Sequence, residues 1–169
     1  MKNKSTLVFY TYTLLSICIA LFSTNADAQE NGIYEIAGNN NVENDREDFY
    51  ELTYQLKPTA YIENNNVKLG GNGGYDNLPI VKLTFNDAKS FNILNQQSIK
   101  LNKVELMTIK LSTAADLNNR IDLNEISGLN RLKYIFIECA FECTESQINQ
   151  FITYDNSIIR VFYKINKPS

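Results

Sequence analysis

The apolar positions in the second half of the chain recur every 26 residues. Three sets share this spacing: Ile80, Leu106, Leu132 and Ile158; Leu83, Ile109, Ile135 and Val161; and Phe85, Leu111, Ile137 and Tyr163. Within each unit they stand at i, i+3 and i+5. A fixed period of about 20–50 residues is typical of stacked repeats, in which each unit buries its apolar face against the next. The pattern predicts a protein that presents a surface, and it names no ligand.

Local patterns predict that strands alternate with short helices from residue 80 onward. The strands are expected over 80–85, 106–111, 132–137 and 158–165. One short helix is expected over 123–129, and a second begins at a capping box formed by Thr144 and Gln147 and runs to about residue 152. Short connections between such elements predict a parallel sheet with its helices on one side.

The segment before residue 80 has a different pattern, which predicts an N-terminal β cap over 29–79. Strands are expected over 33–36, 50–56, 59–62 and 67–69, with a turn at 64–66 and a solvated acidic loop at 43–48. Residues 70–74 are read as a flexible glycine-rich link. They lack the following helix and lysine of a phosphate-binding loop, and they lack the tandem repeat of a calcium-binding turn.

The stretch 126–137 reads I-x-x-L-x-x-L-x-x-I-x-I and resembles the leucine-rich repeat segment L-x-x-L-x-L. The resemblance extends less closely over 80–169 and implies a short α/β stack of the secreted bacterial kind, a class of mostly binding scaffolds. One feature departs from that family. Its asparagine or cysteine three residues past the last apolar position is replaced by Ala88, Ala114 and Ala140 and is kept only as Asn166. The expected fold is therefore an α/β stack of 26-residue units without a full asparagine ladder.

Residues 1–28 have the three parts of a secretory signal peptide. Lys2 and Lys4 are basic, the segment 7–22 is mostly apolar, and 26–28 form an A-x-A cleavage site. The alternatives, an uncleaved anchor or a lipoprotein acylated at Cys18, fit less well because the apolar stretch is short and Cys18 lies inside it. We expect export to the periplasm or beyond, with no stable membrane insertion after cleavage.

Composition narrows the possible chemistry. The chain contains no histidine, which removes the commonest general base and metal ligand and excludes Ser-His-Asp and Cys-His catalysis. Removal of Lys2, Lys4 and Asp27 with the signal peptide takes the net charge from −3 to −4. A mildly acidic chain with scattered charges gives no basic footprint for nucleic acid. No metal or other cofactor is expected.

Two cysteines remain after cleavage, Cys139 and Cys143. An even number in an exported protein favours a disulfide. In an extended strand the two ends would lie roughly 13 Å apart, so a bond requires the chain to turn between them. Free thiols and a redox-active pair are the alternatives, and the second is disfavoured because the spacing is not C-x-x-C.

The strand residues between the buried positions are expected to form an exposed sheet face. Its last two strands would present aromatic side chains beside an arginine, the residue types that anchor protein partners. The candidate binding residues are Lys110, Tyr134, Phe136, Arg160 and Phe162. In the alternative interpretation the β cap or a terminus covers these aromatic residues and they are core. A slip of one residue would likewise exchange the two faces.

These observations favour an exported, non-catalytic binding protein for a protein, peptide or glycan. An inhibitor or immunity-type protein that acts through an acidic surface is the first alternative. The second is a carboxylate-dependent hydrolase, which needs two facing acids about 5–9 Å apart; Glu138, Glu142 and Glu145 are the clustered candidates.

Overall fold

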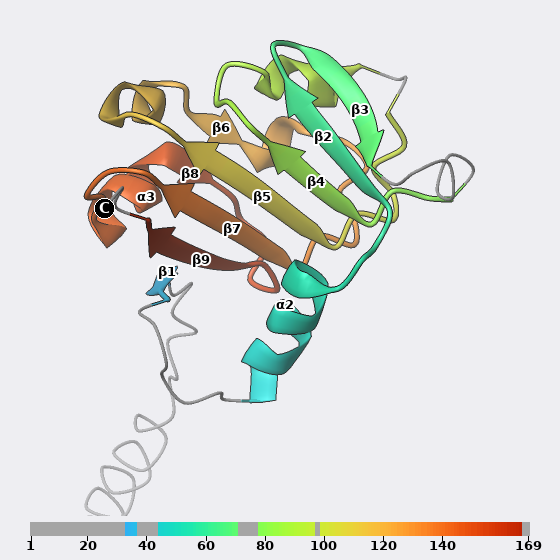
Figure 1. Cartoon of the computed structure of the whole chain (residues 1–169), viewed down its shortest axis with the longest axis horizontal. Helices are drawn as coiled ribbons and strands as arrows, with labels where there is room; N and C mark the ends of the chain where they lie inside the picture. The colour runs from blue at the N-terminus through green and yellow to red at the C-terminus, as the bar shows by residue number, and fades with distance from the viewer. Residues whose placement is uncertain (1–32, 37–43, 71–77, 97–98, 167–169) are drawn as a thin grey trace, which may run out of the picture. The chain divides into compact units, whose positions relative to one another are not determined.

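The computed structural model describes residues 33–36, 44–70, 78–96 and 99–166 (Figure 1). The chain divides into two units, Met1–Glu30 and Asn31–Ser169, and every described residue belongs to the second. The predicted signal peptide and residues 71–74 of the predicted glycine-rich link lie outside the described ranges. In those ranges no helix has the length and apolar character needed to cross a membrane.

The described residues form an α/β fold built on a mixed, mostly parallel sheet of seven strands. Its order is β1-β9-β7-β5-β4-β2-β3, in which only β3 runs antiparallel to its neighbour. The strands are β1 (Ile33–Glu35), β2 (Thr59–Glu63), β3 (Asn66–Gly70), β4 (Lys82–Phe85), β5 (Leu106–Leu111), β7 (Tyr134–Cys139) and β9 (Arg160–Ile165). From β2 to β9 the parallel strands follow one another in chain order, as the singly wound stack predicts.

Strand register departs from a strict 26-residue frame. Lys82 lies opposite Leu106, 24 residues later, and Leu106 lies opposite Tyr134, 28 residues later. Only β7 and β9 keep the spacing of 26, with Tyr134 opposite Arg160. Both deviations are of two residues, so each side chain stays on its expected face, because the side-chain period of a strand is two.

The first of the three apolar sets is not buried as predicted. Leu106 is buried, but on the opposite face from Ile109 and Leu111. The reason is geometric: residues i and i+3 of one strand point to opposite faces. Ile158 precedes β9 in a turn and is 70% exposed. The other two sets are buried as predicted on one face of the sheet, which we call the inner face.

Short elements cover the inner face. They are α3 (Glu145–Phe151), three 3-10 helices (Phe91–Asn95, Ala114–Asn118 and Leu123–Glu125) and a small parallel pair, β6 (Ile121–Asp122) with β8 (Ile152–Thr153). The capping box at Thr144 and Gln147 is confirmed. The helix predicted over 123–129 is reduced to a single 3-10 turn, and Gly128 follows it with a φ of 94°, a left-handed value that favours glycine.

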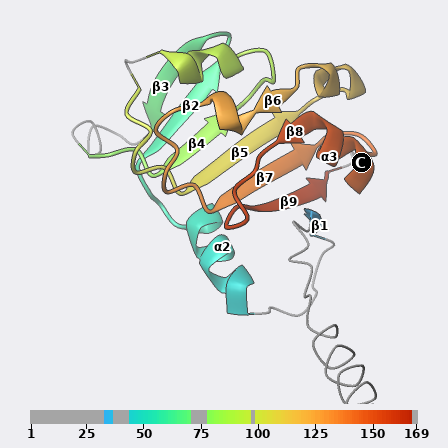
Figure 2. The same cartoon turned by 180° about the vertical axis from the view of Figure 1, so that it is seen from behind.

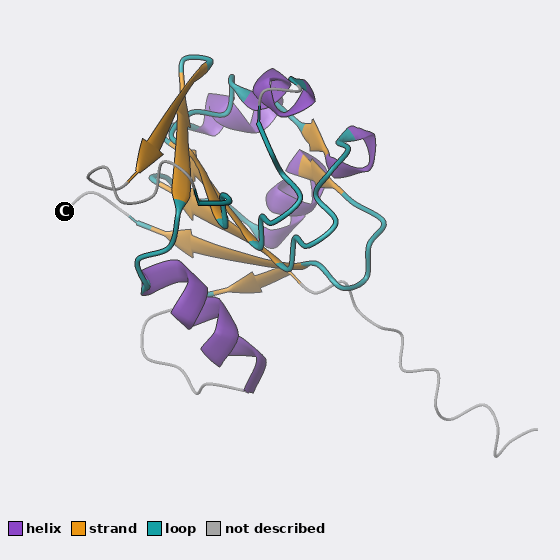
Figure 3. Ribbon diagram, turned by 90° about the vertical axis from the view of Figure 1, so that its right-hand side faces the viewer, coloured by secondary structure: helices purple, strands orange, loops and turns teal. Residues whose placement is uncertain are grey.

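A helix crosses the other face, which we call the outer face. Helix α2 (Asn44–Tyr54) occupies residues predicted as a solvated loop and a strand, and both predictions are wrong there. The alternation of Tyr50, Leu52 and Tyr54 suggested a strand, but the side chains that the helix buries are Phe49 and Leu52, three residues apart. Helices therefore lie on both sides of the sheet rather than on one (Figure 3).

The predicted β cap is divided between the two ends of the sheet. Strands β2 and β3 form the expected hairpin, but β2 also pairs in parallel with β4 and so extends the main sheet. Strand β1 pairs with β9 at the far end (Figure 2). Helix α2 lies between β1 and β2 in the chain, so this connection passes over the outer face while the later connections pass over the inner face.

Candidate functional site

The aromatic residues proposed as a binding surface are buried. Tyr134, Phe136 and Phe162 are 7%, 6% and 2% exposed. They do point to the outer face, as the alternation of the strands predicted, but helix α2 covers them there. We call this group the aromatic cluster; it consists of Phe49, Leu52, Leu106, Tyr134, Phe136 and Phe162. The expectation that these rings are exposed is wrong, and the alternative that they belong to the core is correct.

Phe49 of α2 is the centre of the aromatic cluster. Its ring centroid lies 5.4 Å from that of Phe136, with the rings near perpendicular, and 4.4 Å from that of Phe162. A third edge contact joins it to Tyr134 at 5.7 Å. Such pairs add to the free energy gained by burial, because the positive edge of one ring meets the negative face of another. The cluster therefore fixes α2 to the sheet.

The C-terminus of α2 is fixed by a lysine of the sheet. The Lys82 ammonium donates hydrogen bonds to the carbonyl oxygens of Thr53 (2.9 Å) and Gln55 (3.3 Å). A cation there satisfies carbonyl groups that have no partner within the helix and complements the helix dipole. Burial, and next the nearby charge of Lys57, lower the pKa of Lys82.

The two cationic candidates, Lys110 and Arg160, are both exposed. They lie at different ends of the outer face, because Arg160 begins β9 whereas Lys110 is near the end of β5. The structure therefore does not bring the five predicted residues together as one patch. It separates them into a buried aromatic group, a cation at the start of the strands and a cation near their carboxyl ends.

Polar side chains occupy the carboxyl half of the outer face. Each of them is exposed or half-exposed, and all come from consecutive parallel strands or the residues that follow them. We call this surface the open half-face; it consists of Asn86, Thr108, Lys110, Ser112, Glu138 and Lys164. Sequence reasoning placed these residues on the correct face but expected the ligand to bind at the aromatic end.

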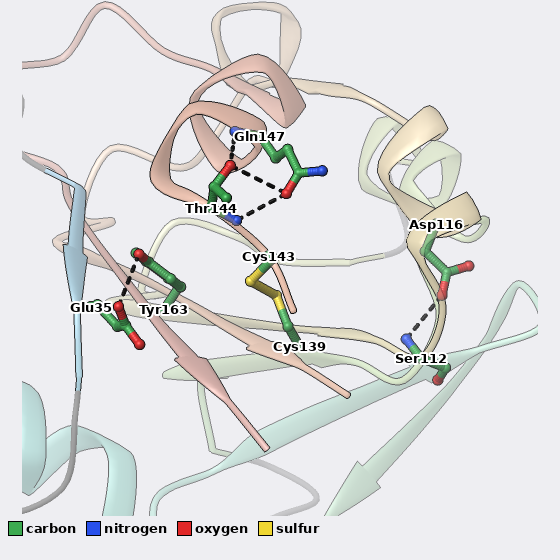
Figure 4. Close-up of a disulfide and its surroundings, with 8 residues drawn as sticks. All are labelled: Glu35, Ser112, Asp116, Cys139, Cys143, Thr144, Gln147 and Tyr163. Atoms are coloured by element: carbon green, nitrogen blue, oxygen red, sulfur yellow. Dashed lines mark hydrogen bonds between the residues drawn. A yellow bond between two sulfur atoms is a disulfide. The ribbon is translucent and has the colours of Figure 1, made fainter. Parts of the chain in front are cut away.

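A row of alternating charge crosses the open half-face. The sheet register places Lys110 opposite Glu138 and Glu138 opposite Lys164. Side chains directly opposite on neighbouring strands are close enough to interact, and unlike charges in such positions attract. Behind the row the backbone of Ser112 is held by a hydrogen bond from its N–H to the Asp116 carboxylate at 2.9 Å (Figure 4). The row is therefore a rigid array of donors and acceptors.

The disulfide lies behind the carboxyl end of β7. Cys139 and Cys143 are bonded, both are buried, and the chain turns between them as the spacing required (Figure 4). The bond connects the end of β7 to Thr144, the N-cap residue of α3. A disulfide here is compatible with an oxidising, exported compartment.

The carboxylates considered for hydrolysis are dispersed among three elements. Glu138 belongs to the open half-face, Glu145 begins α3, and Glu142 lines a shallow cavity of about 530 Å³ with Glu35. Glu35 accepts a hydrogen bond from the Tyr163 hydroxyl at 3.3 Å. Burial and the nearby Glu35 charge raise the pKa of Tyr163. Across the described part of the chain, no group of three His, Cys, Asp or Glu residues is placed to hold a metal ion.

Comparison of the chain with protein families, with curated proteins and with solved structures found no match. The function must therefore be argued from the surfaces themselves.

Proposed function

We propose that this chain is an exported, non-catalytic binding protein, and that its ligand, a protein, peptide or glycan, binds on the open half-face. The observation that carries the proposal is the division of the outer face. Helix α2 covers the aromatic half, whereas Lys110 and Ser112 in the other half are exposed.

A half-uncovered parallel sheet is unusual, which is why this surface stands out. Parallel sheets almost always have both faces covered, because their connections lay helices across them. Here the carboxyl half of one face carries polar residues where a buried strand would carry apolar ones. Ligands of open α/β sheets also bind beyond the carboxyl ends of the strands. Both arguments favour the same end of this sheet.

The side chains of the open half-face favour a polar ligand. Lys110, Glu138 and Lys164 offer alternating charge, and Thr108, Ser112 and Asn86 offer neutral donors and acceptors. Hydroxyl groups of a glycan, or the backbone and charged side chains of a peptide, match such an array. Preorganisation of these groups on a packed sheet reduces the entropy lost when a ligand binds.

The proposal can be tested by comparing two lysine variants. Lys110→Ala removes the charge at the centre of the open half-face, and Lys100→Ala removes an exposed lysine from the loop before β5, at the opposite end of the strand. The purified variants and the wild-type protein are applied to a glycan array and to immobilised envelope proteins of the producing cells. We expect Lys110→Ala to weaken whatever the wild type binds by about tenfold and Lys100→Ala to leave it unchanged.

Equal retention by both variants would contradict the proposal. If binding instead fell in Glu142→Gln while Lys110→Ala retained it, the acidic surface of an inhibitor-type protein would replace the open half-face.

A further inference from the structure

A second surface is formed by the outer edge of the sheet at β3. This strand pairs with β2 along its full length, from Glu63 opposite Asn66 to Thr59 opposite Gly70. It is the last strand of the sheet order, so its other edge has no neighbouring strand among the described residues. An edge strand presents a row of N–H and C=O groups that can pair with another extended chain.

The backbone groups on that edge can be assigned from the turn. Asn64 and Asn65 both have positive φ, 51° and 57°, as a two-residue type I′ turn requires. In such a hairpin the residues that flank the turn exchange backbone hydrogen bonds, and the pattern then alternates along the ladder. Val67 and Leu69 therefore direct their N–H and C=O groups away from β2, and no hydrogen bond joins these groups to another described residue.

The side chains of the same two residues form an apolar margin. Val67 is 37% exposed and Leu69 is 48% exposed. They share a side of the sheet with their partners Ile62 and Ala60, which are fully buried in the inner core. An added strand with apolar side chains on that side would extend the apolar layer of the core by one strand.

The hairpin is held in place before any partner arrives. The N–H of Asn64 donates to the Asp87 carboxylate at 2.7 Å, and the N–H of Asn65 donates to the Ser90 hydroxyl at 2.9 Å. Ser90 is fully buried and donates in turn to Asp87 at 2.8 Å. These bonds anchor the turn to the residues that follow β4, so little ordering of β3 is needed on binding.

Lys68 distinguishes a foreign strand from a second copy of this chain. An antiparallel pair of β3 strands that used the outward groups of both residues would place Val67 opposite Leu69 of the other copy. Lys68 would then lie opposite the same lysine at a Cα separation of about 4.5 Å, where like charges are destabilising. The edge therefore disfavours self-pairing and favours a strand with an acidic residue at that position.

We propose that the outer edge of β3 binds an extended segment of another protein by strand addition, with apolar side chains opposite Val67 and Leu69 and an acidic side chain opposite Lys68. This site lies on the edge of the sheet and is separate from the open half-face, so either proposal can fail without the other.

The test uses a labelled synthetic peptide, Ser-Thr-Val-Glu-Val-Thr-Ser, titrated with the full protein by fluorescence anisotropy. We expect saturable binding that is lost when both valines are N-methylated, because their N–H groups pair with the edge. Replacement of the peptide glutamate by lysine is expected to weaken binding roughly fivefold. In the protein variant Lys68→Glu the preference between the two peptides should reverse.

Two substitutions at one position separate edge pairing from folding. Val67→Pro removes an outward N–H and no bond to β2, a position where an edge strand tolerates proline, whereas Val67→Thr retains the N–H. We expect binding to be lost only in the proline variant, with an unchanged circular dichroism spectrum in both. Binding of the N-methylated peptide, or no saturation with any peptide, would overturn the proposal. A dimer in sedimentation that Val67→Pro dissociates would replace the foreign strand with a second copy.

Discussion

At the scale of single residues, the two faces of each strand bury different kinds of side chain. Ile135 points to the inner face and packs among aliphatic residues, whereas its neighbour Phe136 points to the outer face and packs beneath α2. Sequence alternation placed both correctly relative to each other. It could not show that the second was covered, because the covering residue Phe49 is distant in the sequence and its segment was read with the wrong period.

Ile135→Ala and Phe136→Ala should both destabilise the protein strongly. Each side chain is buried, so each truncation loses burial energy and leaves a cavity, at a cost of about 2–5 kcal/mol for isoleucine and about 3–5 kcal/mol for phenylalanine. The free energy of unfolding, measured by urea titration, checks this against the exposed control Lys110→Ala. A loss below about 1 kcal/mol for Phe136→Ala would mean that its ring is exposed.

A second prediction at this scale concerns the acid stability of the β2–β3 hairpin. Burial raises the pKa of Asp87, but hydrogen bonds from the N–H of Asn64 and the hydroxyl of Ser90 more than offset this and bring it below the ordinary value of 3.8. The carboxylate therefore stabilises the fold above that value, and the contribution is lost as the pH falls through the lower, folded-state pKa.

Asp87→Asn should accordingly be less stable than the wild type at neutral pH, and the difference should shrink below about pH 4. Thermal unfolding across the pH range measures this, with Asp122→Asn as a carboxylate control outside the hairpin. A difference between wild type and Asp87→Asn that stays constant down to pH 2 would contradict the assigned role.

At the scale of elements, α2 was the main feature that sequence reasoning missed. Tyr50, Leu52 and Tyr54 alternate with polar residues, and this pattern favoured a strand. The helical signal was present in the i, i+3 spacing of Phe49 and Leu52 and in the polar, acidic residues before them. Tertiary contacts decide between the two periods: the rings of the outer face provide an apolar surface that Phe49 fills.

The docking of α2 predicts a large difference between two aromatic residues of the same helix. Phe49 is 1% exposed and Tyr54 is 73% exposed. Phe49→Ala should cost about 3–5 kcal/mol of unfolding free energy, whereas Tyr54→Ala should remain within about 0.5 kcal/mol of the wild type. Chemical denaturation of the two variants provides the comparison, and similar values for both would show that α2 does not pack on the sheet.

Elements with strong local signals were predicted more closely. Strand β5 coincides with its predicted range, and the capping box placed the start of α3 correctly. Strand β7 begins two residues later than predicted, at Tyr134 rather than Leu132. Local signals fix where such an element is, but its ends depend on the neighbouring strands with which it pairs.

At the scale of the whole molecule, the sequence predicted the α/β class and the order of the parallel strands but not the layers. The apparent period of 26 is matched by only one strand pair, because the offsets of 24 and 28 average to it. Shifts of two residues keep the apolar pattern intact, so the pattern alone cannot detect them. The sequence likewise predicted the disulfide, because four-residue spacing in an exported chain required only a turn.

The division of the outer face is the central claim, since the open half-face is the proposed ligand surface only if α2 covers the other half. Hydroxyl-radical footprinting with mass spectrometry measures it directly. We predict that Tyr54 and Tyr61 are modified readily while Tyr134, Phe136 and Phe162 are protected. Modification of Phe136 and Phe162 as fast as that of Tyr61 would mean that the aromatic cluster is open to solvent, and the aromatic half would then become the candidate ligand surface.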